Sequence, residues 1–318
     1  MLPEALQLGI ERELLTLNRT RLARAAEQIS ANYQRGQFTG ALNSPEARAA
    51  YLLTRLPATF AANVFVFRET AAIVPDLAPA TLLDLGSGPG TAMWAAREVW
   101  PTLAEFTLIE SHRDFQQLGE RLASGIPAVS RVNADVSAIP QIPPADLVVL
   151  SYSLGELKSP NDVLAKAWRA TKKALIIIEP GTPRNFALVA AIRTQLIGAG
   201  AHIIAPCPHA NGCPMATNSD WCHFAVRVER SADHRRLKGG TLGYEDEKFS
   251  YLAFSKSPVK PAEARIVRHP SIHGGHIQLT LCATEGLKQQ TVTRSDKQLF
   301  RAARKAEWGD AWPPPQLE

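Results

Sequence analysis

The chain has 318 residues, of which 45% are hydrophobic and 20% are charged. This length is typical of about two domains, and the composition is that of a globular protein with a sizeable core. It excludes a disordered chain, a collagen-like repeat and a small disulfide-stapled scaffold. No apolar run approaches the roughly 18 residues of a membrane-spanning helix. Three glutamates in residues 1–15 argue against a secretory signal or transit peptide, so we expect a cytoplasmic protein.

The net charge of +5 is unevenly distributed along the chain. Residues 227–305 carry sixteen Lys and Arg against eight Asp and Glu, whereas the rest of the chain is slightly acidic. Such a segment favours a polyanionic partner, most simply nucleic acid. A solvated basic surface without a partner would have the same composition.

Residues 1–75 are expected to form an N-terminal helical region. Apolar residues recur at spacings of three to four over Leu14–Ile29, with charged residues between them. The sequence Ser44–Glu46 is a helix-start signal, and a helix is expected over 49–56. Pro57 either ends this helix or begins the next one.

From residue 76 the pattern changes to short apolar runs separated by helix-length segments. The runs are Thr81–Leu85, Phe106–Ile109, Asp146–Leu150 and Ala174–Ile178. Apolar strands alternating with helices predict an α/β core with a mostly parallel sheet over 76–204.

The segment 205–318 is expected to contain a cysteine-bearing loop, two strands and the basic part of the chain. The strand-like runs Phe249–Phe254 and His276–Cys282 would suit an antiparallel pair that closes one edge of the sheet.

A glycine-rich loop follows the first predicted strand and precedes a helix. Its glycines would let backbone amides approach a ligand at the helix N-terminus. Glu110, after the second strand, is suited to receive ribose hydroxyls, and Asp135, after the third, to contact an adenine amino group. The predicted cofactor-binding residues are Asp84, Gly86, Ser87, Gly88, Gly90, Glu110, Asp135 and Ser151.

This constellation fits either NAD or S-adenosylmethionine. Asp84 followed by Gly-x-Gly-x-Gly resembles the first motif of class I methyltransferases and differs from the dinucleotide Gly-x-Gly-x-x-Gly motif. A zinc-bearing, NAD-binding oxidoreductase is therefore kept as a more distant alternative.

Catalytic residues are harder to identify. The Asn/Asp-Pro-Pro-aromatic motif of methyltransferases that act on exocyclic amines is missing after the fourth strand. Tyr152 is a candidate for stacking on a base and Glu156 is a candidate general base. Alternatively, both residues cap the next helix.

The four cysteines are Cys207, Cys213, Cys222 and Cys282. Clustered cysteines in an intracellular chain favour metal binding or redox chemistry over disulfides. Four thiolates could hold zinc or an iron–sulfur cluster, and the lack of a Cys-x2-Cys knuckle favours a [4Fe-4S] cluster. His209 and His223 could replace Cys282 in a zinc site. Four unrelated free thiols are the remaining alternative.

Several stretches resemble the bacterial relatives of the mitochondrial small-ribosomal-subunit methyltransferase-like assembly factors. They are Arg55–Thr59, Asp84–Gly90, Glu179–Pro183, Ala205–His209, Cys213–Pro214, Asp220–Phe224 and Arg304–Asp310. The resemblance covers nearly the whole chain, and the cysteine block is its most specific part. It implies a class I methyltransferase-like fold, S-adenosylmethionine binding and action on the small ribosomal subunit during assembly. It also implies a [4Fe-4S] cluster whose ligands would be Cys207, Cys213, Cys222 and Cys282.

We therefore expect an rRNA-binding assembly factor that is monomeric off the ribosome and has no membrane partner. An active rRNA methyltransferase is the first alternative. Basic side chains would contact rRNA phosphates, which supply affinity and salt dependence. The predicted RNA-binding residues are Arg235, Arg236, Lys238, Arg268, Arg294, Arg301, Arg304 and Lys305, with Lys256 and Arg265 as further candidates.

Overall fold

The structure, a computed structural model, describes residues 2–15, 19–34, 44–216, 220–231, 234, 235, 237 and 242–314. Four helices precede the first strand: α1 (Glu4–Leu14), α2 (Arg19–Gln34), α3 (Pro45–Thr54) and α4 (Leu56–Ile73). Ser44 caps α3, because its hydroxyl accepts a hydrogen bond from the Ala47 amide at 3.1 Å. Pro57 lies in the first turn of α4, where its missing amide donor costs no helical hydrogen bond. This part of the chain is helical as expected, but the helix expected over 49–56 ends at Thr54, and α4 begins at Leu56.

Eight strands form the main sheet. They are β1 (Thr81–Leu85), β2 (Glu105–Glu110), β3 (Val129–Asn133), β4 (Ala145–Ser151), β5 (Thr171–Pro180), β6 (His202–Ala205), β7 (Phe224–Glu229) and β8 (Tyr244–Ser255). The order is β3-β2-β1-β4-β5-β8-β6, with β7 also paired to β8. Strands β1 to β5 are parallel, and β8 is inserted antiparallel between β5 and β6. This order, with its one inserted antiparallel strand, is that of the class I methyltransferase fold.

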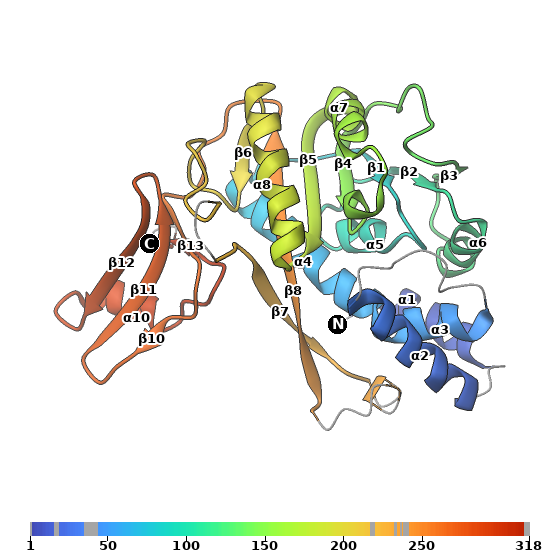
Figure 1. Cartoon of the computed structure of the whole chain (residues 1–318), viewed down its shortest axis with the longest axis horizontal. Helices are drawn as coiled ribbons and strands as arrows, with labels where there is room; N and C mark the ends of the chain where they lie inside the picture. The colour runs from blue at the N-terminus through green and yellow to red at the C-terminus, as the bar shows by residue number, and fades with distance from the viewer. Residues whose placement is uncertain are drawn as a thin grey trace.

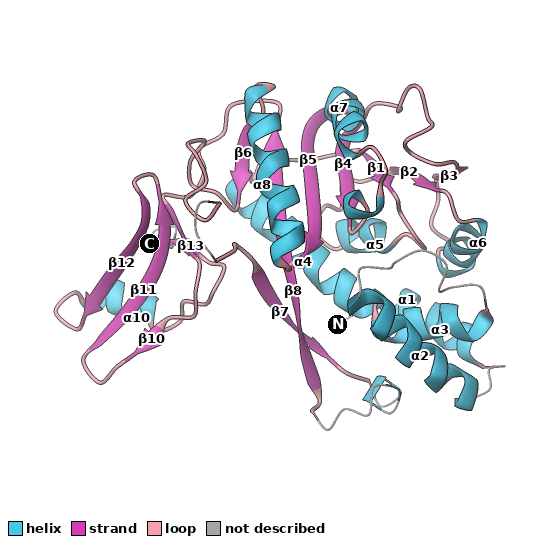
Figure 2. Cartoon of the chain, viewed as in Figure 1, coloured by secondary structure: helices cyan, strands magenta, loops and turns pink. Residues whose placement is uncertain are grey.

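Alternating side chains of the sheet enter two separate cores, one on each face. Leu82, Leu147 and Ile176 pack in the core that includes residues of α1 to α4, α5 (Thr91–Arg97) and α6 (Arg113–Leu122). Their sequence neighbours pack on the opposite face against α7 (Pro160–Ala170) and α8 (Pro183–Gly198). Figure 2 shows helices on both sides of the sheet. Burial on both faces explains why the strands are continuous apolar runs.

A second, antiparallel sheet lies beside the main one (Figure 1). It contains β9 (Ala264–Ile266), β10 (Ser271–Ile272), β11 (His276–Ala283), β12 (Gly286–Thr293) and β13 (Ala311–Trp312). Its own small core includes Leu279 and Trp312, together with Ala303 from α10 (Lys297–Ala303).

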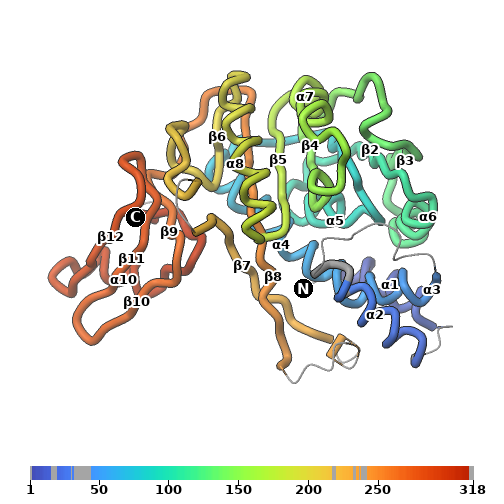
Figure 3. Tube along the Cα trace, viewed as in Figure 1, coloured from blue at the N-terminus to red at the C-terminus, as the bar shows by residue number. Residues whose placement is uncertain are grey.

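The expected antiparallel pairing of Phe249–Phe254 with His276–Cys282 is wrong. The first run lies in β8, where it pairs with β5 on one edge and with β7 and β6 on the other. The second run lies in β11 and pairs with strands of the second sheet. The pair formed by β7 and the first part of β8 extends away from the other strands of the main sheet as a two-stranded arm (Figure 3).

No single helix among the described residues is long and apolar enough to cross a bilayer, although the bent pair α3–α4 together would qualify by length and composition. Both helices contribute to the main core, as the fully buried Leu52 and Phe67 show.

Candidate functional site

The loop after β1 turns sharply at the carboxyl end of the sheet. Gly86 has φ of +75°, and a Cβ placed on it would lie 2.6 Å from the Cβ of Ser153. Only glycine fits this position without strain. The Gly86 and Ser87 amides donate to the Ile109 carbonyl, and the chain then enters α5 through Gly90. The predicted loop geometry, a strand followed by a tight turn and a helix N-terminus, is therefore present.

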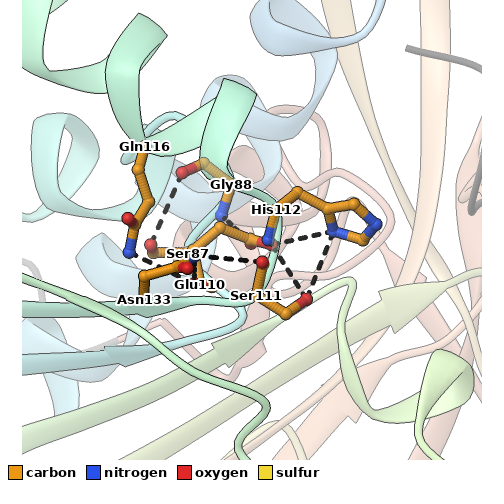
Figure 4. Close-up of polar contacts among 7 residues, drawn as sticks. All are labelled: Ser87, Gly88, Glu110, Ser111, His112, Gln116 and Asn133. Atoms are coloured by element: carbon orange, nitrogen blue, oxygen red, sulfur yellow. Dashed lines mark hydrogen bonds and ion pairs between the residues drawn. The ribbon is translucent and has the colours of Figure 1, made fainter. Parts of the chain in front are cut away.

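Glu110, the last residue of β2, is hydrogen-bonded to the residues around it (Figure 4). Its buried carboxylate accepts hydrogen bonds from the Gly88 amide and the His112 amide, each at 2.8 Å, and contacts the His112 ring at 3.0 Å. Burial alone would raise its pKa, but hydrogen bonds from His112 and Gly88 outweigh burial and lower the pKa. Glu110 is thus an ionised acceptor fixed against the glycine-rich loop.

Asp84 lies beneath this loop and is 1% exposed. One of its carboxylate oxygens, Oδ2, has no hydrogen-bond partner among the described residues. Burial and the nearby Glu110 charge raise the pKa of Asp84 to about 7, although Arg131 opposes the shift. A buried, unsatisfied carboxylate is costly, so the site favours a cationic or hydrogen-bond-donating group at this position.

We expect Asp84 to make the ligand-free chain less stable as the pH rises. Because its pKa is raised from 3.8 to about 7 in the folded state, its contribution to stability is complete below about pH 4 and is lost as the pH rises through 7. Asp84→Asn should remove this part of the pH dependence, so the difference in Tm between variant and parent should grow from pH 5 to pH 8. Parallel pH profiles of Tm would contradict the assignment.

The other predicted cofactor residues lie around the same sheet edge, but they differ in whether their side chains are free to contact a ligand. Asp135 is exposed two residues beyond β3, and its carboxylate accepts a hydrogen bond from the Ser137 amide at 2.8 Å. The Ser151 hydroxyl, at the end of β4, accepts from Asn63 of α4 at 2.9 Å. Ser151 therefore joins the sheet edge to the N-terminal helices.

Tyr152 and Glu156 flank the loop after β4. Tyr152 has φ of +56°, which is unfavourable for a residue with a side chain. Much of the Glu156 surface is accessible, yet the surrounding protein and the Glu110 charge raise its pKa to about 7. Glu156 thus has a pKa suited to proton transfer near neutral pH.

The Tyr152 side chain is held by two residues that the sequence did not single out individually. Its hydroxyl donates to Glu247 of β8 at 2.9 Å, and Arg55 binds both oxygens of Glu247 at 3.1 and 3.2 Å. Burial and the Glu247 charge raise the pKa of Tyr152 well above its ordinary value. Arg55 begins one of the stretches quoted for the family resemblance, which is the signal that could have identified it.

Tyr152→Phe is expected to destabilise the fold by about 1 kcal/mol, because it removes one hydrogen bond while Arg55 still pairs with Glu247. Urea unfolding measures this change. Tyr244→Phe is the matched control, because Tyr244 is exposed on the arm that carries Glu247. This substitution should have a smaller effect. Equal losses in the two variants would contradict a role for the Tyr152 hydroxyl.

Glu179 is a further buried acid at this edge. It is 1% exposed at the end of β5, and it accepts a hydrogen bond from the Leu154 amide at 2.9 Å, in the short 3-10 helix Leu154–Glu156. Burial raises its pKa to about 8, against the lowering effect of the backbone hydrogen bonds. Its role is to fix the loop that carries Tyr152 and Glu156.

A second candidate site is a pocket lined by all four cysteines. Cys207 follows β6, Cys213 lies in the next loop, Cys222 precedes β7 and Cys282 lies on β11. The structure therefore brings together residues up to 75 positions apart, as predicted. Within the described residues, no three His, Cys, Asp or Glu side chains form a group that could hold a metal ion.

The pocket is apolar around the thiols and basic at its base. Burial is the main cause that raises the pKa of Cys207, Cys222 and Cys282, the last to about 12. Two buried arginines, Arg193 and Arg265, also line the pocket. Without a bound cation these cysteines are thiols at neutral pH.

Aromatic residues connect the Cys222 loop to the second sheet. The Trp221 and His223 rings stack at 5.0 Å between centroids, and His223 meets Trp308, which follows α10, at 4.7 Å. His209, the other candidate zinc ligand, lies 3.9 Å from the Cys282 sulfur through Nε2. The cysteine pocket is thus the junction between the two sheets.

The predicted RNA-binding residues differ in how far their charges are available to a partner. Arg236 and Lys238 lie outside the described residues, and Arg235 is exposed beside them. Arg268 pairs with Asp220 and lies 5.5 Å from the Trp308 ring centroid, while Lys256 lies 3.7 Å from the Trp168 ring centroid.

The expectation for Arg265 is wrong. This residue is 1% exposed and forms an ion pair with Glu69, so its guanidinium cannot reach an RNA phosphate. Its Nε and Nη1 also donate to the carbonyls of Pro206 and Gly309 at 3.1 and 2.7 Å.

The remaining cations form what we call the α10 cationic face, defined as Lys297, Arg301, Arg304 and Lys305. Lys297 and Arg301 lie on α10, and Arg304 and Lys305 directly follow its end. All four are exposed, whereas Ala303 packs in the core of the second sheet. Arg294, at the end of β12, is also exposed and approaches the Phe300 ring at 6.0 Å. Across the described ranges, none of these five side chains forms an ion pair with a carboxylate.

The order of the main sheet, the turn after β1 and the acid at the end of β2 together define an α/β protein of the class I methyltransferase fold. To this fold the chain adds a four-cysteine pocket and a second sheet with a cationic face.

Residues 45–313 match the family described as mitochondrial small ribosomal subunit Rsm22, and the chain belongs to this family. The human mitochondrial ribosome assembly protein METTL17 is 31% identical over 290 residues, which cover 83% of this chain and 62% of that protein. The Rsm22-cox11 tandem protein 2 of Schizosaccharomyces pombe is 25% identical, over 87% of this chain and 44% of its own length. The chain thus spans about half to two thirds of these relatives.

Among solved structures, a SAM-dependent methyltransferase from Aquifex aeolicus overlaps with a TM-score of 0.41 and 17% identity, over 65% of this chain and 95% of that one. The strand order, rather than this overlap, defines the fold.

Proposed function

We propose that the chain is an assembly factor of the small ribosomal subunit that binds S-adenosylmethionine and an iron–sulfur cluster. Membership of the Rsm22 family is the observation that supports the ribosomal role. The two sites described above would bind the two ligands. The relatives named above are ribosome assembly or Rsm22-type proteins, which supports the same role here.

S-Adenosylmethionine fits the residues at the carboxyl ends of β1 and β2. Its ammonium group is a cation and a hydrogen-bond donor, and it would satisfy the unpaired Oδ2 of the buried Asp84 carboxylate. Glu110 is an ionised acceptor suited to ribose hydroxyls, and the tight turn at Gly86 would let the backbone approach the ligand closely. We expect affinity for S-adenosylmethionine to increase as the pH rises through 7, because Asp84 ionises there.

An iron–sulfur cluster fits the cysteine pocket better than a single zinc ion. All four cysteines line one pocket, and their spacing along the chain lacks the Cys-x2-Cys knuckle that is usual for zinc. Cys207, Cys213, Cys222 and Cys282 would be the ligands. When bound, the cluster would join the Cys222 loop to β11 and so fix the second sheet.

The α10 cationic face supplies the contact with rRNA in this proposal. Its unpaired, exposed cations can neutralise phosphates, whereas Arg268 already pairs with Asp220. Such contacts give affinity without sequence preference.

Anaerobic purification, followed by iron, sulfide and zinc analysis and by titration with S-adenosylmethionine and NADH, tests both ligands. We expect about four iron and four sulfide per chain and broad absorption near 400 nm. Binding of S-adenosylmethionine without binding of NADH is expected as well. One zinc and no iron, or binding of NADH alone, would contradict the proposal.

Methyl transfer to rRNA is the second candidate function, and the pKa of Glu156 favours it. Against it, the Tyr152 hydroxyl donates to Glu247, a carboxylate that Arg55 also holds in place, so the side chain is tied to β8 rather than free to contact a base. An assay with labelled S-adenosylmethionine and immature small subunits distinguishes the two functions. We expect binding without transfer of the label.

A further inference from the structure

Arg193 is a buried cation whose charge the protein leaves without a carboxylate. It lies on α8 and is 3% exposed. Its Nε donates to the Cys207 sulfur at 3.3 Å, and its Nη2 donates to the His209 carbonyl at 2.6 Å. In the part of the chain that the structure describes, it forms no ion pair with Asp or Glu.

Arg265, on the other side of the same pocket, provides a direct comparison. It is equally buried, but Glu69 neutralises it. A buried charge without a counterion is strongly unfavourable, so such a charge indicates that a partner of opposite charge binds beside it.

We propose that Arg193 is the counterion and positioning residue of the iron–sulfur centre. This inference rests on the centre proposed above. A cluster of four iron and four sulfide ions on four thiolates carries two net negative charges when oxidised and three when reduced. The guanidinium would balance part of this charge, and its N–H to sulfur hydrogen bond would hold Cys207 in place. Because the reduced form is the more negative, the cation stabilises it preferentially and raises the reduction potential.

Two substitutions separate charge from geometry. Arg193→Gln removes the charge and keeps a hydrogen-bond donor, whereas Arg193→Lys keeps the charge but loses the planar fork that bridges Cys207 and His209. Arg184→Gln, an exposed arginine near the start of the same helix, is the matched control.

The full chain and its variants are purified without oxygen, and the midpoint potential is measured by dithionite titration followed by absorption and electron paramagnetic resonance. Arg193→Gln should shift the midpoint to a clearly more negative value or reduce the iron content of a folded chain. Arg193→Lys should give a smaller negative shift, and Arg184→Gln should match the parent.

Parent-like iron content and midpoint potential in both Arg193 variants would overturn the inference. If Arg193→Gln does not fold, as judged by circular dichroism, the midpoint of Arg193→Lys decides, and identity with the parent overturns the inference. If the parent itself takes up no iron, the proposed cluster fails, which is a different result from the failure of Arg193.

Discussion

Cys207→Ser is expected to prevent cluster binding and to lower the stability of the anaerobic protein by about 4 kcal/mol, the contribution of a ligand present at a thousand times its Kd. The cysteine pocket lies at the junction of the two sheets, so the loss should fall mainly on the second sheet and on the Trp221–His223–Trp308 contacts. Iron analysis, thermal unfolding and hydrogen exchange of β9 to β13 measure the three effects.

The control for this prediction is to compare the stability of the parent and Cys207→Ser after iron has been removed. After chelation of iron from both proteins, the parent and Cys207→Ser should have nearly the same Tm, because serine differs from cysteine by little volume. A variant that keeps normal iron content, stability and RNA affinity would show that Cys207 is not a ligand. A stability difference that survives chelation would assign Cys207 a packing role instead.

Neutralising the α10 cationic face is expected to weaken RNA binding strongly. In Arg301→Gln/Arg304→Gln/Lys305→Gln, three phosphate contacts are lost, so the slope of log K against log salt should become shallower by about 2 to 3. Loss of these three contacts should lower the affinity for RNA by about a hundredfold at physiological salt. Binding to small-subunit RNA at several salt concentrations measures both quantities.

The triple variant Lys158→Gln/Arg169→Gln/Lys172→Gln is the matched control, since it makes the same charge change at exposed residues near α7. It should retain nearly parent-like affinity and salt slope. Equal losses in the two triple variants would mean that overall charge, rather than the α10 cationic face, determines the affinity.

The core of the main sheet could be predicted from the sequence because its strands are buried on both faces. Thr81–Leu85 was expected as a strand and is β1 with the same bounds. The polar strand β12 (Gly286–Thr293) has little apolar signal, since most of its side chains are exposed. The second sheet therefore could not be recognised from periodicity, and β11 was assigned to the wrong partner.

The candidate sites likewise contain local features that the sequence reveals and long-range contacts that it does not. The glycine-rich turn and Glu110 are local features, so spacing along the chain was enough to identify them. The contacts of Tyr152 and Arg55 with Glu247 join positions 95 and 192 residues apart. The burial of Arg265 depends on Glu69, 196 residues away. Such long-range pairs decide which cations are free for a partner, and no short pattern contains them.

The most direct test of the proposed role is binding of the anaerobically purified full chain to ribosomal particles from its own source, measured by sedimentation through sucrose gradients. The proposal predicts that the protein sediments with immature small subunits and binds mature small subunits and large subunits much more weakly. The α10 triple variant should lose this association while keeping its ligands. Equal binding to immature small subunits and to large subunits would contradict the account.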